Sequence, residues 1–444
     1  MGGVSVSVTR VFCHVEPGQV PTVVPTNEIH VLLYGSVPMV EGTRIAGVQL
    51  ADLASRFGLV LLDEAFDFVS IALAVTACDT FVMRDTGDDG WSREFDVTLP
   101  LAVPETWEGV RSRLESALRF LSGDIWNFRF VAGGRRPPQA AEVRKRKRVI
   151  ALDRVDCACL FSGGLDSATG AFRLMEEGRR PLLVSHIYRG DKGYQDTAAR
   201  NLPRQMPRVG ANFYPTWQGV DDDSMRTRSV SFMGLGVLAA TAISQFRGDR
   251  VIDLIMPENG FIALNAPLTT RRIGTHSTRT AHPHFLTEIR AILEVVGLPV
   301  RLVNPYEHST KGEMVRAFRD NRDYVRLALA TVSCGKWKRK SMQCGRCVPC
   351  LVRRSAFHAG GVNDTTRYEC AEISKVLDNE TTRDDVIAVL TAIRRFSSRS
   401  EANRHWVLQA GPLPIEPRQR EAYVSVFERG IGELESFLKA SGLS

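Results

Sequence analysis

The sequence lacks the segments that would carry a chain into or across a membrane. Residues Met1 to Val8 contain neither a basic start nor a long apolar run, so no secretory signal peptide is predicted. The apolar run near Val69 to Ala77 is bounded by Asp67 and Asp79 and is too short to span a bilayer. We therefore expect a soluble, cytoplasmic protein with no membrane partner.

The chain also lacks a Walker A loop, a Gly-x-Gly-x-x-Gly loop and internal repeats. Its charges are not dominated by one sign: the net charge of +7 and the pI near 9.0 favour an anionic partner such as a nucleotide, without demanding nucleic acid. With 444 residues, 44% hydrophobic and 24% charged, the chain is expected to form two or three globular domains.

Nine cysteines are present, and four of them lie close together. An odd total with a tight cluster favours reduced thiols and a bound metal over a disulfide framework. Cys334, Cys344, Cys347 and Cys350 follow the spacing C-x9-C-x2-C-x2-C, which supplies the four thiolates of a closed, structural Zn²⁺ site. Ordinary core cysteines and an iron–sulfur cluster are the alternatives.

The stretch Leu160 to Ser167 reads LFSGGLDS and carries the strongest functional signal. An apolar run typical of a buried strand breaks at two glycines, and a helical pattern begins at Asp166. A strand, a glycine turn and a helix N-terminus together present backbone N–H groups that can bind a phosphate. Ser162 and Ser167 add hydroxyl donors. The alternative is an ordinary glycine-containing turn between a strand and a helix.

Strand-like and helical patterns are mixed before residue 133, which predicts an N-terminal α+β domain over residues 1–132. The strand-like runs are Ile29 to Tyr34, Phe95 to Leu99 and Trp126 to Val131, and the helical ones are Leu62 to Val82 and Trp107 to Leu121. The sequences GGRRPP at 133–138 and RKRKR at 144–148 predict a basic linker over residues 133–148. Such a run of charge is more typical of a solvated surface than of a nucleic-acid site.

From residue 149 to 361, strand-like runs alternate with helical ones, which predicts a doubly wound parallel sheet. Ligands of such sheets bind beyond the C-terminal ends of the strands, where the SGGLDS loop lies. Residues 362–444 are predicted to be helical. The strand candidates are Val149 to Leu152, Cys157 to Phe161, Pro181 to Tyr188, Val251 to Pro257 and Pro299 to Asn304, and the helical ones are Ser167 to Glu177, Ser229 to Gln245, Phe285 to Val296, Lys311 to Asn321 and Arg420 to Ser441.

SGGLDS resembles the pyrophosphate loop, SGGxDS, of the N-type ATP pyrophosphatases, which cleave ATP between the α and β phosphates. Combined with the cysteine cluster, residues 150–360 resemble the 7-cyano-7-deazaguanine synthase family, known as QueC. The resemblance implies an adenine nucleotide alpha hydrolase-like fold that uses ATP and Mg²⁺ and holds Zn²⁺ on the four cysteines. The residues that would hold the ATP phosphates are Ser162, Gly163, Gly164, Asp166 and Ser167, and Asp166 would also help to place Mg²⁺.

Further polar residues are candidates for the same site. Arg228 lies at the start of an apolar helix, a place suited to an anionic group, and is predicted to be catalytic together with Asp166 and Ser167. Glu258 and Asn259 follow a strand candidate and are expected to bind the edge of a deazaguanine. The segment Leu268 to Pro283 is expected to form a binding loop or lid. Its candidate substrate-binding residues are Arg271, His276 and Arg279. The alternatives are a surface charge for Arg228, a strand-end cap for Glu258 and an ordinary loop histidine for His276. Lys311 is a further phosphate-binding candidate.

The long N-terminal region departs from the synthases. The longer chain, with this added region and the stretches ENGFIALNAPLT at 258–269 and TRTAHPHF at 278–285, resembles the QueC-like proteins of bacterial antiphage systems, such as the QatC proteins of the Qat system. That resemblance implies adenylation of a 7-carboxy-7-deazaguanine-type carboxylate and its transfer to ammonia or to the N-terminal amine of a partner protein. A small defence-system protein would then dock on the N-terminal domain. A housekeeping synthase, a tRNA thiolase and a non-catalytic nucleotide-binding scaffold are the alternatives, and direct nucleic-acid binding is not favoured.

Overall fold

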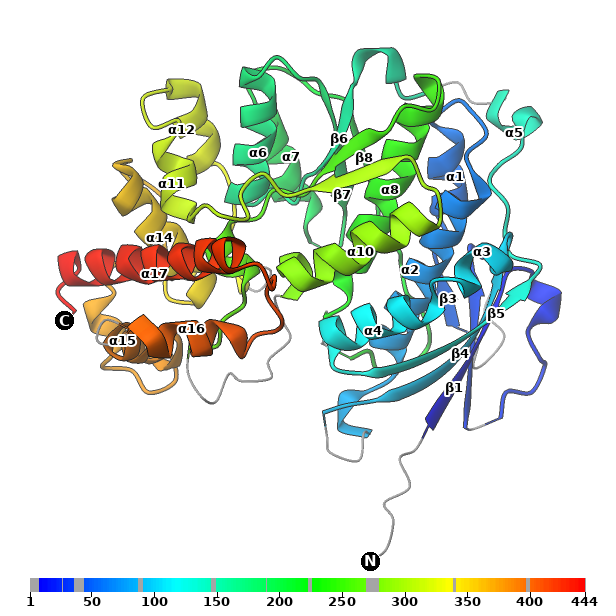
Figure 1. Cartoon of the computed structure of the whole chain (residues 1–444), viewed down its shortest axis with the longest axis horizontal. Coiled ribbons are helices and arrows are strands. Elements are labelled where there is room, and N and C mark those ends of the chain that lie inside the picture. Colours follow the sequence, from blue (N-terminus) through cyan, green and yellow to red (C-terminus); the bar gives the residue numbers. More distant parts are fainter. Residues whose placement is uncertain are drawn as a thin grey trace, which may run out of the picture.

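The chain forms two parallel sheets and a helical C-terminal region (Figure 1). The computed structural model describes residues 8–25, 27–35, 44–86, 91–144, 149–188, 190–222, 226–268, 279–337, 341–396 and 400–443. All statements about structure concern these residues.

The first sheet has the strand order β3-β2-β1-β4-β5, and every pairing is parallel. Its strands are β1 (Val8–His14), β2 (Glu28–Leu33), β3 (Arg44–Ala46), β4 (Glu94–Leu101) and β5 (Ile125–Ala132). This pairing makes the N-terminal region α/β in type, whereas the pattern predicts α+β. The pattern misses β1 because Arg10 and His14 interrupt its apolar run, and β3 because three residues are too few to show a period.

The second sheet has the order β10-β9-β6-β7-β8 and is again wholly parallel. Its strands are β6 (Cys157–Leu160), β7 (Pro181–His186), β8 (Arg208–Ala211), β9 (Ile252–Ile255) and β10 (Val300–Val303). Along β6, Cys157 and Cys159 join the apolar cluster on one face, while Ala158 and Leu160 join the cluster on the other. Both faces are therefore covered, which confirms the predicted doubly wound fold.

Two details of the second sheet differ from the prediction. The run Val149 to Leu152 is not a strand. The Ile150 N–H donates to the carbonyl of Arg56, which ends helix α1 (Leu50–Ser55), at 2.8 Å, and a 3-10 helix follows. This backbone is thus engaged away from the sheet. The pattern also misses β8, because Gly210 lies in a run of only four residues.

Two long apolar helices join the sheets. Helix α2 (Asp63–Phe81) packs on α8 (Arg228–Phe246), and α8 lies against β6, β7 and β9 (Figure 1). One apolar core runs through both helices from the first sheet to the second. Helix α8 is long and apolar enough to cross a membrane. However, 83% of its most apolar stretch is buried inside the protein, so it is a core helix. The domain division at residues 133–148 stays a prediction, and residues 145–148 lie outside the described chain.

The helices at residues 140–144, 192–200, 260–263 and 322–329 were not predicted, so the sequence pattern accounts for only part of the other helices around the sheets. They are α3 (Pro104–Glu108), α4 (Arg111–Ser122), α5 (Ala140–Arg144), α6 (Leu165–Glu176), α7 (Lys192–Arg200), α9 (Gly260–Ala263), α10 (Pro283–Val295), α11 (Lys311–Arg316) and α12 (Arg322–Leu329), with short 3-10 helices at Pro17–Gln19, Arg84–Thr86, Leu152–Arg154, Arg279–Ala281 and Ser374–Val376. The single helix predicted over Trp107 to Leu121 is divided, because α3 ends at Gly109 and Val110 leaves the helical conformation. The helix predicted over Lys311 to Asn321 ends at Arg316.

The predicted helical C-terminal region is confirmed. It comprises α15 (Asp384–Phe396), α16 (Ser400–Leu408) and α17 (Pro417–Ala440), and it is preceded by α14 (Val348–Gly360). Helix α17 packs on α14, α15 and α9 around an apolar cluster of its own (Figure 1). Glu433 of α17 accepts hydrogen bonds from the Thr310 hydroxyl and, at 3.1 Å, from the Gly312 N–H. These bonds fasten α17 to the start of α11, which carries Lys311.

Close packing of α8 on the second sheet requires a small residue at position 236. A Cβ on Gly236 would stand 2.8 Å from the side chains of Leu160 and Leu254. We expect Gly236→Ala to lower the free energy of unfolding by about 1–3 kcal/mol, measured by urea denaturation. Gly432→Ala in α17 is the matched control, because a Cβ there meets nothing within 4 Å, and it should leave stability unchanged or raise it. Equal losses in both variants would contradict this packing argument.

Candidate functional site

The SGGLDS loop joins β6 to α6 at the C-terminal end of the central strand of the second sheet. Gly163 has a φ of +79°, and a Cβ there would stand 2.9 Å from the Gln195 Cα, so glycine is required. Ser167 Oγ accepts a hydrogen bond from the Ser162 N–H at 3.2 Å and donates one to the Gly164 carbonyl at 3.0 Å. These contacts fix the loop in the form of a cradle for an anion.

Asp166 is the charged centre of the loop and is only 6% exposed. Its Oδ1 lies 3.0 Å from Lys311 Nζ, and its Oδ2 accepts a hydrogen bond from Asn259 Nδ2 at 2.7 Å. Burial opposes ionisation of Asp166, but the ion pair and the hydrogen bonds outweigh it and lower the pKa of this carboxyl. Asp166 is therefore held as a carboxylate.

Glu258 follows β9 and is coupled to Asp166. Burial, followed by the negative charge of Asp166, raises the pKa of Glu258 well above its ordinary value. Two adjacent carboxyls, one ionised and one favouring its proton, concentrate oxygen ligands of the kind that Mg²⁺ prefers. The donor set of this corner therefore fits a divalent cation.

Two cavities meet at the loop, with volumes of about 380 and 510 Å³. The smaller is bounded by α9, α14 and α17 and contains Lys311, while the larger is bounded by the starts of α7 and α8 and by the cysteine segment. Ser162, Gly164, Ser167 and Glu258 line both cavities. Two reactants bound in the separate cavities would meet at these residues.

Arg228 brings positive charge to the larger cavity. It begins α8, and its guanidinium forms an ion pair with Asp191, whose side chain is buried. The same guanidinium lies 5.7 Å from the centre of the Tyr188 ring. Lys311 and Arg228 thus approach the loop from the two different cavities, and each is paired with an aspartate.

Most of the sequence-predicted site residues come together around the loop, but the side chain of Asn259 is directed at Asp166 and that of Arg279 at Phe120. Asn259 lines neither cavity. Its amide donates to Asp166 and its Oδ1 accepts from the Ile262 N–H at 3.0 Å, so it positions Asp166. Arg279 donates to the Phe120 carbonyl at 3.0 Å and lies over the Phe120 ring, toward α4. Arg271 and His276 lie outside the described residues.

Sequence reasoning missed the residues that close the larger cavity, chiefly Asp191, Tyr194 and Trp337. Asp191 shares a signal with Glu258, because both are acidic residues shortly after a predicted strand. Tyr194 and Trp337 meet edge to face, with ring centres 6.4 Å apart. This contact joins α7 to the cysteine segment across about 140 residues of chain, so no local sequence pattern could predict it.

The four cysteines converge as predicted. The sulfur atoms of Cys334, Cys344, Cys347 and Cys350 lie within 4.8 Å of one another, and all four residues are buried. Backbone N–H groups point at the sulfurs: those of Lys336 and Cys344 lie 3.3 Å from Cys334 Sγ. Such donors stabilise thiolates, and four thiolates in this arrangement fit a tetrahedral Zn²⁺.

The cysteine cluster also shapes the site. Cys334, Gly335 and Trp337 line the larger cavity, and the Val332 N–H donates to the Gly163 carbonyl at 3.2 Å. The metal-binding segment and the glycine loop are thus hydrogen-bonded to each other. Zinc bound here would order one wall of the cavity without touching the reactants.

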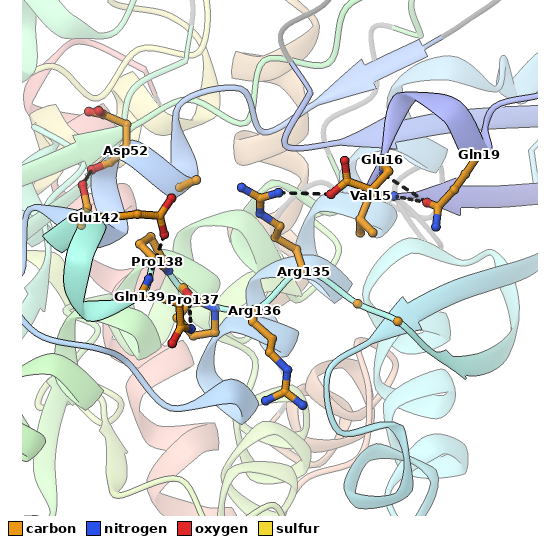
Figure 2. Close-up of a pocket in the computed structure, with 14 residues that line it drawn as sticks. Val15, Glu16, Gln19, Asp52, Arg135, Arg136, Pro137, Pro138, Gln139 and Glu142 are labelled. Atoms are coloured by element: carbon orange, nitrogen blue, oxygen red, sulfur yellow. Dashed lines mark hydrogen bonds and ion pairs between the residues drawn. The ribbon is translucent and has the colours of Figure 1, made fainter.

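A third and larger cavity, of about 840 Å³, lies at the first sheet and is separate from this site (Figure 2). It is lined by the GGRRPP stretch, by residues that follow β1, and by α1. Arg135 pairs with Glu16 at 3.4 Å, and Arg136 pairs with Asp63. Its arginines are therefore already balanced by carboxylates, and the chemistry concentrates at the SGGLDS loop.

Comparison with known proteins agrees with this geometry. Over 73 residues, 16% of this chain, the sequence is 42% identical to the 7-cyano-7-deazaguanine synthases of Brucella ovis, Brucella canis and Brucella suis. The match spans 29% of the length of each relative, and no protein-family model matches the chain. The similarity to these synthases is therefore confined to a short part of the chain.

The metal assignment predicts about one Zn²⁺ per chain in the purified protein, measured by elemental analysis. Cys344→Ser is expected to lose the metal and to lower the melting temperature. Cys370→Ser is the matched control, because Cys370 lies outside the four-sulfur cluster, and it should retain zinc. Iron in stoichiometric amount, or zinc retained in Cys344→Ser, would refute a four-thiolate zinc site.

Proposed function

We propose that this QueC-like protein is an ATP-dependent, AMP-forming enzyme that adenylates a 7-carboxy-7-deazaguanine-type carboxylate and passes the acyl group to an amine. The observation that carries the proposal is the glycine loop shared by two cavities, with Glu258 at their junction and the Asp166–Lys311 ion pair in the smaller cavity. The short similarity to 7-cyano-7-deazaguanine synthases and the cysteine cluster support this choice of chemistry.

The residues of the loop suit the phosphates of ATP. The first-turn N–H groups of α6, at Leu165 to Ser167, have no partner within the helix and would hold the pyrophosphate that departs. The Ser162 and Ser167 hydroxyls would turn to it from the hydrogen bonds that they make within the loop. Lys311 and Arg228 would offset its negative charge from opposite sides. Mg²⁺ would be held by Asp166 and Glu258 and would neutralise charge on the phosphates.

The reaction has two steps. A carboxylate oxygen of the substrate attacks the α-phosphorus, the bond from that phosphorus to the bridging oxygen breaks, and pyrophosphate leaves with the electron pair. The amine nitrogen then attacks the carbonyl carbon of the acyl-adenylate, AMP leaves, and the nitrogen gives up a proton. The chain contributes by aligning the two reactants in adjoining cavities and by excluding water.

We further propose that the acceptor is the N-terminus of a small partner protein, or ammonia, and that the reaction serves antiphage defence in the cytoplasm, as in Qat-like systems. Support comes from the size of the N-terminal region, which has its own five-stranded sheet. One face of that sheet carries Arg10, Asp96, Asn127 and Arg129 as exposed residues. A face of this kind on an all-parallel sheet is suited to cover by a partner.

Pyrophosphate release tests the proposal. The purified protein, given ATP, Mg²⁺, 7-carboxy-7-deazaguanine and an amine, is expected to release pyrophosphate and AMP. Asp166→Asn should reduce the rate roughly 100-fold or more, because it removes the charge at the loop. Asp153→Asn is the control, since that carboxylate is largely exposed and lies outside both cavities.

The products separate the alternatives. Mass spectrometry would find an amide on the acceptor protein if a protein amine is used, or free 7-cyano-7-deazaguanine if the enzyme is a plain synthase. The absence of pyrophosphate release by the wild-type protein under all these conditions would overturn the proposed chemistry. Phage protection retained by Asp166→Asn would favour a scaffold.

The cation site makes a separate prediction. Glu258→Gln keeps the shape of the side chain but removes the carboxyl that would give up its proton to bind Mg²⁺, so the Mg²⁺ concentration needed for half-maximal activity should rise roughly tenfold or more. The rate at saturating Mg²⁺ should recover in large part. A Glu258→Gln variant with an unchanged Mg²⁺ requirement would show that this carboxyl is not a ligand.

A further inference from the structure

Four charged side chains are buried together where the first sheet meets the start of α8. Asp79, Arg84, Arg93 and Asp124 are each at most 8% exposed. Asp79 Oδ1 accepts hydrogen bonds from Arg93 at 2.6 Å and from Arg84 at 3.1 Å. Asp124 accepts from the same arginines at 2.8 and 2.9 Å. With two positive and two negative charges the cluster is balanced, which satisfies the requirement for burying ions.

The second oxygen of Asp79 is used differently. Asp79 Oδ2 accepts from the Thr227 N–H at 3.1 Å and from the Thr227 hydroxyl at 2.9 Å. Thr227 is the N-cap of α8, yet its hydroxyl makes no capping bond to its own helix. The carboxylate of Asp79, which belongs to α2, is therefore what fixes the first residue of α8, and its negative charge suits a helix N-terminus.

Two further contacts tie the same segment to the N-terminal region. Arg226 donates to the Ser122 carbonyl at 3.0 Å, and its guanidinium lies 3.9 Å from the centre of the Trp91 ring. Asp222 donates its N–H to the Thr80 carbonyl at 2.9 Å and accepts from the Arg84 N–H at 2.8 Å. The described residues that lead into α8 are thus anchored on the first sheet and on α2.

The next residues of the chain belong to the candidate site. Arg228 and Ser229 line the larger cavity, and Arg228 reaches Asp191 on its far side. The first turn of α8 is consequently held by Asp79 on one side and by Asp191 on the other. A displacement of Thr227 would move the guanidinium of Arg228 relative to the glycine loop.

We propose that Asp79 and Thr227 are positioning residues that set Arg228 for ATP, so that the N-terminal region forms part of the ATP-using site. The inference rests on the proposed function, because its readout is the use of ATP. It assigns to α2 a role in the chemistry that is separate from partner docking.

The test uses full-length protein and the pyrophosphate-release assay. Thr227→Val removes the hydroxyl and leaves the backbone bond to Asp79, and we expect the KM for ATP to rise about tenfold with a smaller change in kcat. Thr227→Ser restores the donor and should stay within about twofold of the wild type. Thr241→Val is the matched control: Thr241 is buried in the same helix, and among the described residues its hydroxyl has no hydrogen-bond partner.

A double-mutant cycle distinguishes positioning from a general structural role. If Thr227 acts through Arg228, Thr227→Val should cause no further rise in KM when Arg228→Ala is already present. Additive effects, or a fall in melting temperature with an unchanged KM, would overturn the inference. Arg226→Gln, which removes a second anchor, carries the same test if Thr227→Val does not fold. Inactivity of the wild-type protein would instead count against the proposed function.

Discussion

The packing of α2 on α8 is the interaction on which the structure depends. Each helix is apolar almost all round, so neither can face water, and each finds cover only on the other and on a sheet. Because α2 packs on the first sheet and α8 packs on the second, the contact between the two helices merges the two sheets into one core. The same contact carries Asp79 to the start of α8, next to Arg228. Hydrophobic burial thus brings Asp79 next to the start of α8, and its hydrogen bonds to Thr227 then fix the position of α8 relative to α2.

Charge balance organises the candidate site in the same way. Asp166 is kept ionised by Lys311, Arg228 is paired with Asp191, and Glu258 is left with a raised pKa between them. Lys311 and Arg228, which line the two cavities, therefore each have a carboxylate partner within the protein. Binding of a polyphosphate with its cation would redistribute these pairs, and such rearranged pairs provide selectivity for a highly charged ligand.

Those parts of the fold and site that rest on local pattern could be predicted from the sequence. The strand, glycine turn and helix at SGGLDS lie within one short stretch, and the cysteine spacing is itself a short-range signal. Long-range contacts could not be predicted. Asn259 turns to Asp166 and Arg279 turns to Phe120 because of neighbours far away in sequence. The first sheet could not be predicted as all-parallel either. Polar residues on the open face of β1 interrupt its apolar run, so this strand was missed.

The shared core also has a consequence for synthesis. During translation, α2 leaves the ribosome well before α8, since about 150 residues separate them. At typical elongation rates of roughly 5–20 residues per second, the apolar surface of α2 waits on the order of 10–30 s for its partner. In that interval the apolar surface of α2 is exposed to solvent and prone to aggregation. Folding in the cell would therefore depend on chaperones that shield this surface. A chain shortened to the second sheet and its helices would leave the surface of α8 that packs on α2 exposed permanently.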